Sequence, residues 1–397
     1  MIIYSPEIEV LPTKKVRLSC DFDTKGERQT LWYEFDEKWK DYLVIEQADA
    51  FLVGLLLLAL KNKENIQIET AVSNKLLYQL NNYLIPILVH VFEEFKTCQI
   101  TALEKSKLNL SGQNTDYYKI KGAATGVSCG VDSFSTIKRH LELEGELKIK
   151  YLTFFNAGSN GDYGGTNARE LFHKRLKGVK RFTDEVGLSL IAVDSNISEL
   201  LNMSFVKTDS LRNLSCTLAI QKLFTNYYYS SAFKFSELNF NSKGMHNYDL
   251  IFLSYLNTET TSFYPSMIDK TREERTSDIS SYKYAWKHLD VCTSSFNTVN
   301  KKNCSKCHKC MRTQLTLDVI NRLNHFDKVF DIDTYKKNVD SYISYLLAKK
   351  DLYVLDKTLL VFLKNNGFKI TLKHKLLSKK IVIKRSINKI KSIFKNE

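Results

Sequence analysis

Apolar and polar residues alternate with a period of two near the start of the chain. The alternation covers residues 14–22 and returns at 31–35, with a polar turn containing Gly26 between the two segments. A period of two is typical of half-buried strands, so this region predicts a β-hairpin. Apolar spacing predicts four further elements: a buried helix at 47–61, a strand at 66–70, a helix at 74–95 and a strand at 99–103. We therefore expect an N-terminal α/β domain with a hairpin over residues 1–110.

From residue 117 onward, the pattern becomes a regular succession of strands and helices. It predicts strands at 120–127, 149–155 and 188–194 and helices at 132–143 and 166–186. Such alternation indicates a doubly wound parallel sheet, in which ligands bind outside the carboxyl ends of the strands. Two loops rich in small residues, 126–131 and 156–165, follow strands at that edge. We expect this α/β domain to cover residues 117–325, after a polar boundary at 105–117, and a helical region to cover 326–397.

The first of these loops has the composition of a phosphate-binding turn. Small residues lead from the strand into Ser128-Cys129-Gly130-Val131, and Asp132 and Ser133 are typical first residues of a helix. A strand, a tight turn and a helix start direct backbone N–H groups and the positive end of the helix toward one point, which suits a phosphate group. The segment lacks the Gly-Lys-Ser/Thr of a Walker motif. Taken alone, the same residues also fit a turn that binds nothing.

The hexad Ser128-Cys129-Gly130-Val131-Asp132-Ser133 resembles the Ser-Gly-Gly-x-Asp-Ser signature of the PP-loop ATP pyrophosphatases. The resemblance implies an adenine nucleotide α-hydrolase-like sheet, cleavage of ATP between the α- and β-phosphates, and activation of a carboxylate or carbonyl oxygen as an adenylate. It also implies that all six residues bind ATP, that Asp132 and Ser133 are catalytic, and that Mg²⁺ bridges the phosphates near Asp132. Cys129 stands where the family has glycine, a residue with more backbone freedom, so we expect an altered turn.

Further motifs narrow the resemblance to the 7-cyano-7-deazaguanine synthase-like proteins over about residues 122–320. Those proteins carry an Arg-Asn step, a Tyr-Pro-Asp-Cys-Arg segment and a four-cysteine zinc site, in this order. Here Arg212-Asn213 precedes an apolar helix, and Tyr264-Pro265 follows it. Ser266-Met267-Ile268 replaces the Asp-Cys-Arg of those proteins, so the chain departs from the family in the segment that bears on the deazapurine substrate.

Several residues outside the hexad are candidates for binding nucleotide or substrate. A guanidinium grips phosphate or carboxylate through two parallel hydrogen bonds, so we expect Arg212 to be catalytic and Asn213 to orient the ligand. Basic residues at 270–275 are candidates to neutralise pyrophosphate, and the loop at 156–165 is a candidate to contact adenosine. The residues singled out in these segments are Phe155, Asn156, Gly158, Lys270 and Arg272, with Arg275 beside them. A helix cap, a solvated charged face and a plain loop are the alternative interpretations.

Four cysteines have the spacing of a metal site. Cys304, Cys307 and Cys310 form two overlapping Cys-x-x-Cys steps, and Cys292 lies upstream. Four thiolates bind Zn²⁺ tetrahedrally at about 2.3 Å, and closed sites of this kind are structural. We therefore predict zinc, which the resemblance also places here, with Arg312 at the family's following arginine. An iron–sulfur cluster, redox-active cysteines and thiols without a role remain alternatives, with His308 a candidate substitute ligand.

The charge of the chain is concentrated at its end. Of the net charge of +14, residues 369–397 carry ten Lys and Arg against one Glu. Apolar residues at helical spacing in this tail predict a basic amphipathic helix, which fits RNA, an anionic membrane surface or a solvated helix packed on its own domain. The longest apolar run, 51–60, is shorter than the roughly 20 residues of a membrane span. Eight cysteines without a secretory signal indicate reduced thiols and a cytoplasmic protein.

These features together predict an ATP-dependent, AMP- and pyrophosphate-forming ligase with ATP, Mg²⁺ and Zn²⁺ as cofactors. An adenylate of a small carboxylate or purine-like substrate would accept ammonia or another nitrogen or sulfur nucleophile. Two other functions stay open. The chain is alternatively a nucleotide-binding subunit of a homodimer or larger protein complex with weak catalysis, or a tRNA-modifying PP-loop enzyme that holds RNA through its basic tail.

Overall fold

The computed structural model describes residues 1–106, 121–292, 301–349 and 353–393, and side chains up to residue 383 in the last helix. The described residues group into two compact units. The first, which we call the sheet unit, comprises residues 1–128, 136–233 and 238–268. The second, the helical unit, comprises residues 129–135, 234–237 and 269–397. The chain therefore passes from one unit to the other within the hexad. The predicted boundary at 105–117 lies almost entirely outside the described residues.

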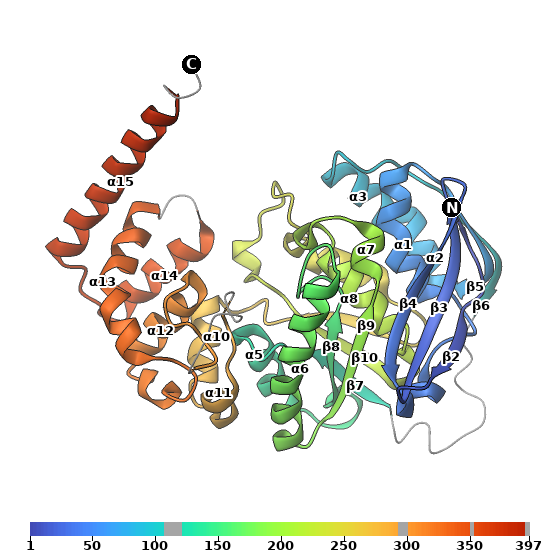
Figure 1. The fold of residues 1–397 in the computed structure, drawn as a ribbon, viewed down its shortest axis with the longest axis horizontal. Helices are drawn as coiled ribbons and strands as arrows, with labels where there is room; N and C mark the ends of the chain where they lie inside the picture. The colour runs from blue at the N-terminus through green and yellow to red at the C-terminus, as the bar shows by residue number, and fades with distance from the viewer. Residues whose placement is uncertain (107–120, 293–300, 350–352, 394–397) are drawn as a thin grey trace. The chain divides into compact units, whose positions relative to one another are not determined.

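One sheet of eleven strands organises the sheet unit (Figure 1). Its strands are β1 (Ile2–Ile3), β2 (Glu7–Leu11), β3 (Lys15–Thr24), β4 (Glu27–Asp36), β5 (Ile66–Ser73), β6 (Ile100–Ser106), β7 (Gly122–Gly126), β8 (Ile149–Asn156), β9 (Ser189–Ser195), β10 (Phe224–Ser230) and β11 (Ser262–Ser266). They lie in the order β11-β10-β7-β8-β9-β4-β3-β1-β5-β6, with β2 paired to β3. The four strand pairs β8–β9, β7–β8, β7–β10 and β10–β11 are parallel, as predicted for the α/β region.

The predicted hairpin is confirmed. β3 and β4 pair antiparallel from Lys15–Asp36 to Thr24–Glu27, and alternate residues of β3 are buried, as the period of two requires. The connecting residues Lys25 and Gly26 have φ angles of 51° and 80°. Two left-handed residues form the tight turn that matches the twist of paired strands.

The N-terminal strands share a sheet with the parallel strands. β4 pairs antiparallel with β9 through Tyr33–Ser195 and Glu34–Asp194. The residues predicted as an N-terminal α/β domain, 1–110, therefore continue the sheet of the following region, and their described part lies in the same compact unit. The physical reason is that β9 would otherwise expose an unpaired edge, which the hairpin covers.

The order of the parallel strands reverses beside β7. β8 and β9 follow β7 on one side, whereas β10 and β11 lie on its other side. In doubly wound sheets, such a reversal opens a crevice outside the carboxyl ends of the strands, where ligands bind. The loop after β7, which carries the hexad, starts at this point of the sheet.

Helices pack on both faces of the parallel strands. Phe154 of β8 stacks on Phe172 of α6 (Thr166–Val186), with ring centroids 5.2 Å apart. Its neighbours Tyr151 and Phe155 belong instead to the apolar core shared with α1 (Asp49–Asn62) and α8 (Asp209–Leu218). Successive residues of a strand point to opposite faces, so the two layers confirm a doubly wound arrangement. Further helices among the described residues of this unit are α2 (Asn74–Gln79), α3 (Ile85–Val91), α7 (Ile197–Leu201) and α9 (Asp249–Phe252).

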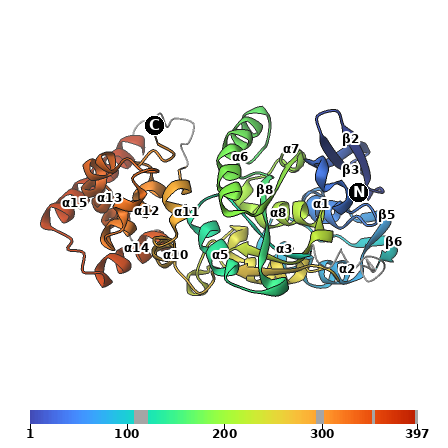
Figure 2. The same ribbon diagram turned by 90° about the horizontal axis from the view of Figure 1, so that it is seen from below.

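The C-terminal part is helical, as predicted (Figure 2). Its helices are α10 (Arg272–Ile279), α11 (Lys283–His288), α12 (His308–Val319), α13 (Ile332–Lys349), α14 (Val354–Asn365) and α15 (Leu372–Ile393). Asp340 of α13 pairs with Lys373 at 2.6 Å and with His374 at 2.9 Å, which holds the start of α15 on α13. Most side chains of the predicted amphipathic face lie outside the described residues. Among the residues described, no helix has the length and apolar character to cross a bilayer.

A buried carboxyl group ties α1 to the sheet. Asp49 is fully buried and accepts hydrogen bonds from the Ser73 backbone N–H at 2.8 Å and from the side-chain amides of Gln47 at 2.5 Å and Gln221 at 3.1 Å. Burial raises the pKa of Asp49 to about 7 despite these donors. The network joins the helix start to β5 and to the segment before β10.

Asp49 is expected to give the stability of the protein a pH dependence. Its folded pKa lies above the unfolded value of about 3.9, so between about pH 4 and 7 the folded state binds more protons and the free energy of unfolding falls as pH rises. The free energy of unfolding of Asp49→Asn should not show this loss. Relative to the wild type, it should therefore rise by roughly 2–4 kcal/mol from pH 5 to pH 8, as measured by urea denaturation at both pH values. An identical difference between the two proteins at both pH values would contradict this assignment.

Candidate functional site

The hexad forms the strand–turn–helix that its sequence predicts. β7 ends at Gly126, the Val127 N–H donates to the Thr153 carbonyl at 2.8 Å, and α5 (Val131–Leu141) begins four residues later. The Gly130 carbonyl accepts the Phe134 N–H at 3.0 Å and the Ser133 hydroxyl at 3.1 Å. The first turn of α5 is thus closed on Gly130, and the turn sits directly after the strand at which the sheet order reverses.

Cys129 adopts the backbone conformation that favours glycine. Its φ is 57°, in the left-handed region, and its backbone carbonyl accepts the Asp290 N–H at 2.8 Å. The thiol is 1% exposed, and burial raises its pKa to about 12. A buried thiol with a raised pKa stays mostly protonated near neutral pH, which disfavours Cys129 as an activated nucleophile. Cys216 is also buried, and burial raises its pKa as well.

Asp132 is held by two arginines of the helical unit. Its Oδ1 lies 2.8 Å from an amino nitrogen of Arg275, and its Oδ2 lies 2.9 Å from an amino nitrogen of Arg272. The Arg275 side chain is fully buried, and its Nε donates to the Lys270 carbonyl at 3.1 Å. The structure therefore brings the predicted residues Asp132 and Arg272 together, with Arg275 as a third member. The Lys270 ammonium pairs with Asp278 at 2.5 Å instead.

A capping box explains why these arginines share one face. The Thr271 hydroxyl accepts the Glu274 N–H at 3.2 Å, and the Glu274 carboxylate accepts the Thr271 N–H at 2.6 Å. This pair starts α10 at Arg272, so that Arg272 and Arg275 lie one turn apart on the helix surface. The Thr-x-x-Glu spacing is visible in the sequence and is a signal that could have placed the helix start.

Arg212 is enclosed by backbone carbonyls of the sheet unit. Its guanidinium donates to the carbonyls of Asp162 and Met203, each at 2.8 Å, and to the Ser198 hydroxyl at 3.2 Å. The side chain is fully buried, and burial lowers its pKa to about 10. This arrangement braces the loop after β8. A catalytic or phosphate-binding role of Arg212 stays a prediction, as does ligand binding by Asn213, whose side-chain amide lies 3.5 Å from the Tyr229 hydroxyl.

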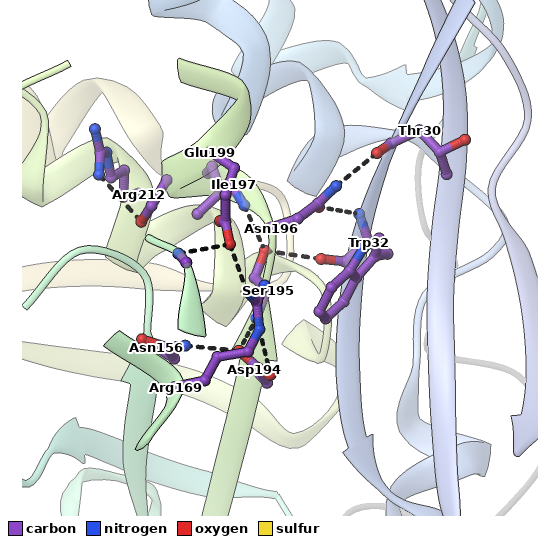
Figure 3. A network of polar contacts seen from close by, with 12 residues as sticks. Thr30, Trp32, Asn156, Arg169, Asp194, Ser195, Asn196, Ile197, Glu199 and Arg212 are labelled. Carbon is purple, nitrogen blue, oxygen red and sulfur yellow. Dashed lines mark hydrogen bonds and ion pairs between the residues drawn. The ribbon is translucent and has the colours of Figure 1, made fainter. Parts of the chain in front are cut away.

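A polar network joins the carboxyl ends of β8 and β9 (Figure 3). The Asn156 side-chain amide donates to Asp194 at 2.7 Å, and Arg169 pairs with Asp194 at 3.2 Å and with Glu199 at 2.6 Å. Glu199 also accepts the Gly165 N–H at 3.0 Å, which fixes the far end of the loop. The side chain of Asn156 is thus engaged by the network, and its contact with adenosine stays a prediction.

The other two residues predicted to contact adenosine are tightly packed. Phe155 is buried in the core, and Gly158 has φ 119°, where a Cβ atom would lie 2.7 Å from an Arg212 amino nitrogen. Sequence analysis missed Arg169, Asp194 and Glu199. Asp194 ends a predicted strand at the ligand edge of the sheet, and this position was the signal that could have identified it.

The four predicted cysteines converge. The sulfur atoms of Cys292, Cys304, Cys307 and Cys310 all lie within 4.8 Å of one another. Cys310 Sγ is 3.9 Å from Cys304 Sγ and 3.4 Å from Cys307 Sγ, close to the roughly 3.8 Å between sulfurs of a tetrahedral zinc site. All eight cysteines are in the described part of the chain, and none forms a disulfide. The cluster can therefore hold a metal ion.

Local backbone geometry preorganises this four-cysteine cluster. The Cys304 N–H points to Cys292 Sγ at 3.4 Å, and the Cys307 N–H points to Cys304 Sγ at 3.3 Å, contacts that favour thiolates. Ser305 has φ 59° and is fully buried, and its carbonyl accepts the Gln314 amide at 3.0 Å. The left-handed residue turns the chain around the sulfurs, and α12 begins directly after Cys307.

Both ring nitrogens of His308 lie near other side chains and not near the four sulfur atoms. Its Nε2 lies 3.4 Å from the Asp356 carboxylate, and its Nδ1 lies 3.3 Å from Arg312. Arg312 pairs with the buried Asp356 at 3.0 Å, which joins α12 to α14. The group of potential ligands found in the described residues contains four cysteines and not His308. Charge compensation of the thiolates by Arg312 stays a prediction.

Comparison with protein-family models, curated proteins and solved structures gives no match to this chain. Membership of the PP-loop ATP pyrophosphatases, and likeness to the 7-cyano-7-deazaguanine synthase-like proteins, therefore stay predictions. What the structure shows is an α/β protein with a hexad turn at a reversal of sheet order and a cysteine cluster suited to a metal ion.

Proposed function

We propose that the protein is an ATP-dependent ligase that forms AMP and pyrophosphate. The single observation that carries the proposal is the position of the hexad turn, directly after β7 where the strand order reverses. Ligands of doubly wound sheets bind outside the carboxyl ends of the strands at such a reversal. The start of α5 adds the N–H groups and dipole that favour a phosphate there.

The polyphosphate of ATP would lie on residues 128–133, and its negative charge would be met by Arg272 and Arg275. Preorganised positive charge stabilises the pyrophosphate as it leaves, which is the main requirement of the reaction. Mg²⁺ would be held mainly by the phosphates, with Asp132 as the acidic residue of the hexad, and would neutralise polyphosphate charge.

The four-cysteine cluster is proposed to bind structural Zn²⁺. Four thiolates at these separations leave no open coordination position, so the ion would stabilise the start of α12 and take no part in chemistry. The substrate would be a small carboxylate or purine-like molecule, and ammonia or another nitrogen or sulfur nucleophile would attack its adenylate. A cytoplasmic location is part of this proposal.

A second candidate function is nucleotide binding without efficient catalysis, within a protein complex. The observation that favours it is the engagement of both Asp132 oxygens by arginines, which compete with a metal ion for this carboxylate in the free protein. The buried Cys129 thiol, whose pKa is raised by burial, also fits a site without a protein nucleophile. Turnover, and not binding, separates this candidate from the ligase.

The ligase is tested by product analysis. Purified protein with labelled ATP, Mg²⁺, ammonia and a panel of carboxylates is expected to release AMP and pyrophosphate, and Asp132→Asn should lower the rate at least about 100-fold. Asp184→Asn, an exposed residue of α6 paired to Lys180, is the matched control and should keep the wild-type rate. Release of ADP and phosphate, or ATP binding without turnover across the panel, would contradict the ligase.

A further inference from the structure

We propose that Arg272 and Arg275 form a polyphosphate-binding pair that Asp132 occupies in the free protein, so that the ligand must displace the Asp132 carboxylate. The ligand class is pyrophosphate or the β- and γ-phosphates of a nucleoside triphosphate. This inference rests on the proposed function, since it assigns the residues that hold its leaving group. It also changes the role of Asp132. In the free protein this carboxylate would pair with the two arginines, and it would be available to a cation only after a ligand has displaced it.

The geometry of the pair is that of a two-pronged anion site. Each arginine donates to a different oxygen of Asp132, at 2.8 and 2.9 Å, as two guanidiniums donate to adjacent oxygens of a phosphate. Arg275 is fully buried and anchored by the Lys270 carbonyl, whereas the side chains of Arg272 and Asp132 are 21% and 24% exposed. Arg275 is therefore the buried member of the pair, whereas Arg272 and Asp132 are partly exposed to solvent. An anion from solvent can reach the pair from the side of Arg272 and Asp132.

One hydrogen-bond donor of the arginine pair, Arg272 Nε, is buried and lacks an acceptor among the described residues. A buried donor without an acceptor costs about 1–3 kcal/mol, so the ion pair with Asp132 alone does not satisfy this side chain. A pyrophosphate has more acceptor oxygens than a carboxylate and could accept from Nε as well as from the amino nitrogens.

The charge balance around α10 favours an anion of higher charge. Two guanidiniums face the one carboxylate of Asp132. The nearby acidic groups have other partners: Asp278 pairs with Lys270 at 2.5 Å, and Glu274 pairs with Lys234 at 3.4 Å. Glu273 is buried, and burial raises its pKa, which weakens it as a competing anion. Pyrophosphate carries enough charge to displace the carboxylate and neutralise both arginines.

Displacement would release Asp132 from its cationic partners. The residue lies in the first turn of α5, so rotation of one side chain is sufficient to leave the arginines. Its carboxylate would then be available to a divalent cation that accompanies the polyphosphate. The same carboxylate thus keeps Arg275, a buried charge, paired when no ligand is bound.

The test is titration of inorganic pyrophosphate, without divalent cations, followed by calorimetry. Asp132→Ala is expected to bind pyrophosphate at least about 10-fold more tightly than the wild type, because no carboxylate competes. Arg272→Gln in the Asp132→Ala background should abolish the gain. Asp184→Ala removes one negative charge elsewhere and should leave the affinity unchanged. AMP, which lacks the two outer phosphates, should show no gain with Asp132→Ala, and ATP should gain as pyrophosphate does.

Unchanged or weaker pyrophosphate binding by Asp132→Ala would overturn the proposal and leave the ion pair a purely structural contact. Because this variant removes one partner of the buried Arg275, thermal unfolding is measured beside binding, together with the milder Asp132→Asn. Pyrophosphate should raise the melting temperature of both variants more than that of the wild type, and the absence of this difference would also overturn the proposal. Tighter pyrophosphate binding by a protein that forms no AMP would retain the arginine pair and refute the ligase.

Discussion

Replacing Cys310 by serine is expected to release the metal ion and unfold the beginning of α12. Cys310 is fully buried in the first turn of that helix, and its sulfur contacts those of Cys304 and Cys307. Structural zinc contributes about 10–16 kcal/mol in zinc-finger peptides, so loss of one ligand should cost several kcal/mol of the free energy of unfolding. Metal analysis of the wild type should find about one Zn²⁺ per chain, and analysis of Cys310→Ser should find little.

The control for this experiment is Cys98→Ser. Cys98 is a buried thiol outside the four-cysteine cluster, so its replacement should keep the metal and cost only the lost packing. Stoichiometric zinc retained by Cys310→Ser would refute the assignment. Iron and acid-labile sulfide in the wild type would identify an iron–sulfur cluster, and a chain without metal would leave the four thiols unassigned.

Arg212→Met is expected to destabilise the protein by about 3–5 kcal/mol, the cost of disrupting a buried charged group with its hydrogen bonds. The substitution removes the Arg212 donor from the partly buried carbonyls of Asp162 and Met203 and removes the contact to Ser198. Met has a similar length, so the effect reports the lost hydrogen bonds more than lost volume. Urea denaturation measures the free energy directly.

The matched control is Arg181→Met on α6. Arg181 is exposed and donates within its own helix to the Lys177 carbonyl at 3.3 Å, so its replacement should change stability by less than about 0.5 kcal/mol. The pair of variants also separates two roles of Arg212. Normal stability with weakened ATP binding in Arg212→Met would support the predicted contact with phosphate and refute the bracing role.

Local patterns were sufficient for many elements. The period of two in residues 14–22 and 31–35 corresponds to β3 and β4, and the small residues before Asp132 correspond to β7 and the start of α5. The spacing of Cys304, Cys307 and Cys310 corresponds to a short segment that brings their sulfur atoms close together. Each of these features depends on neighbours within about ten residues, whose geometry backbone sterics and helical spacing restrict strongly.

Contacts between distant segments could not be predicted in the same way. The pairing of β4 with β9 joins residues at least 160 positions apart, and Asp132 meets Arg275 across 143 positions. Neither partner carries a local mark of the other, since a strand edge or an arginine can be satisfied by many groups. Arg212 shows the same limit: the sequence suggests a surface charge before an apolar helix. In the structure, Arg212 lies inside α8, is fully buried and donates to three acceptors within the fold.

Spacing along the chain was therefore enough to propose a phosphate-type turn and to identify four potential metal ligands, because both features are built from residues close together. Tertiary packing alone determined that the N-terminal strands extend the same sheet, that the Cys129 thiol is buried, and that Asp132 is already engaged by two arginines. The reason is that burial, edge pairing and charge neutralisation depend on which distant groups meet, and those meetings are set by the free energy of the whole fold.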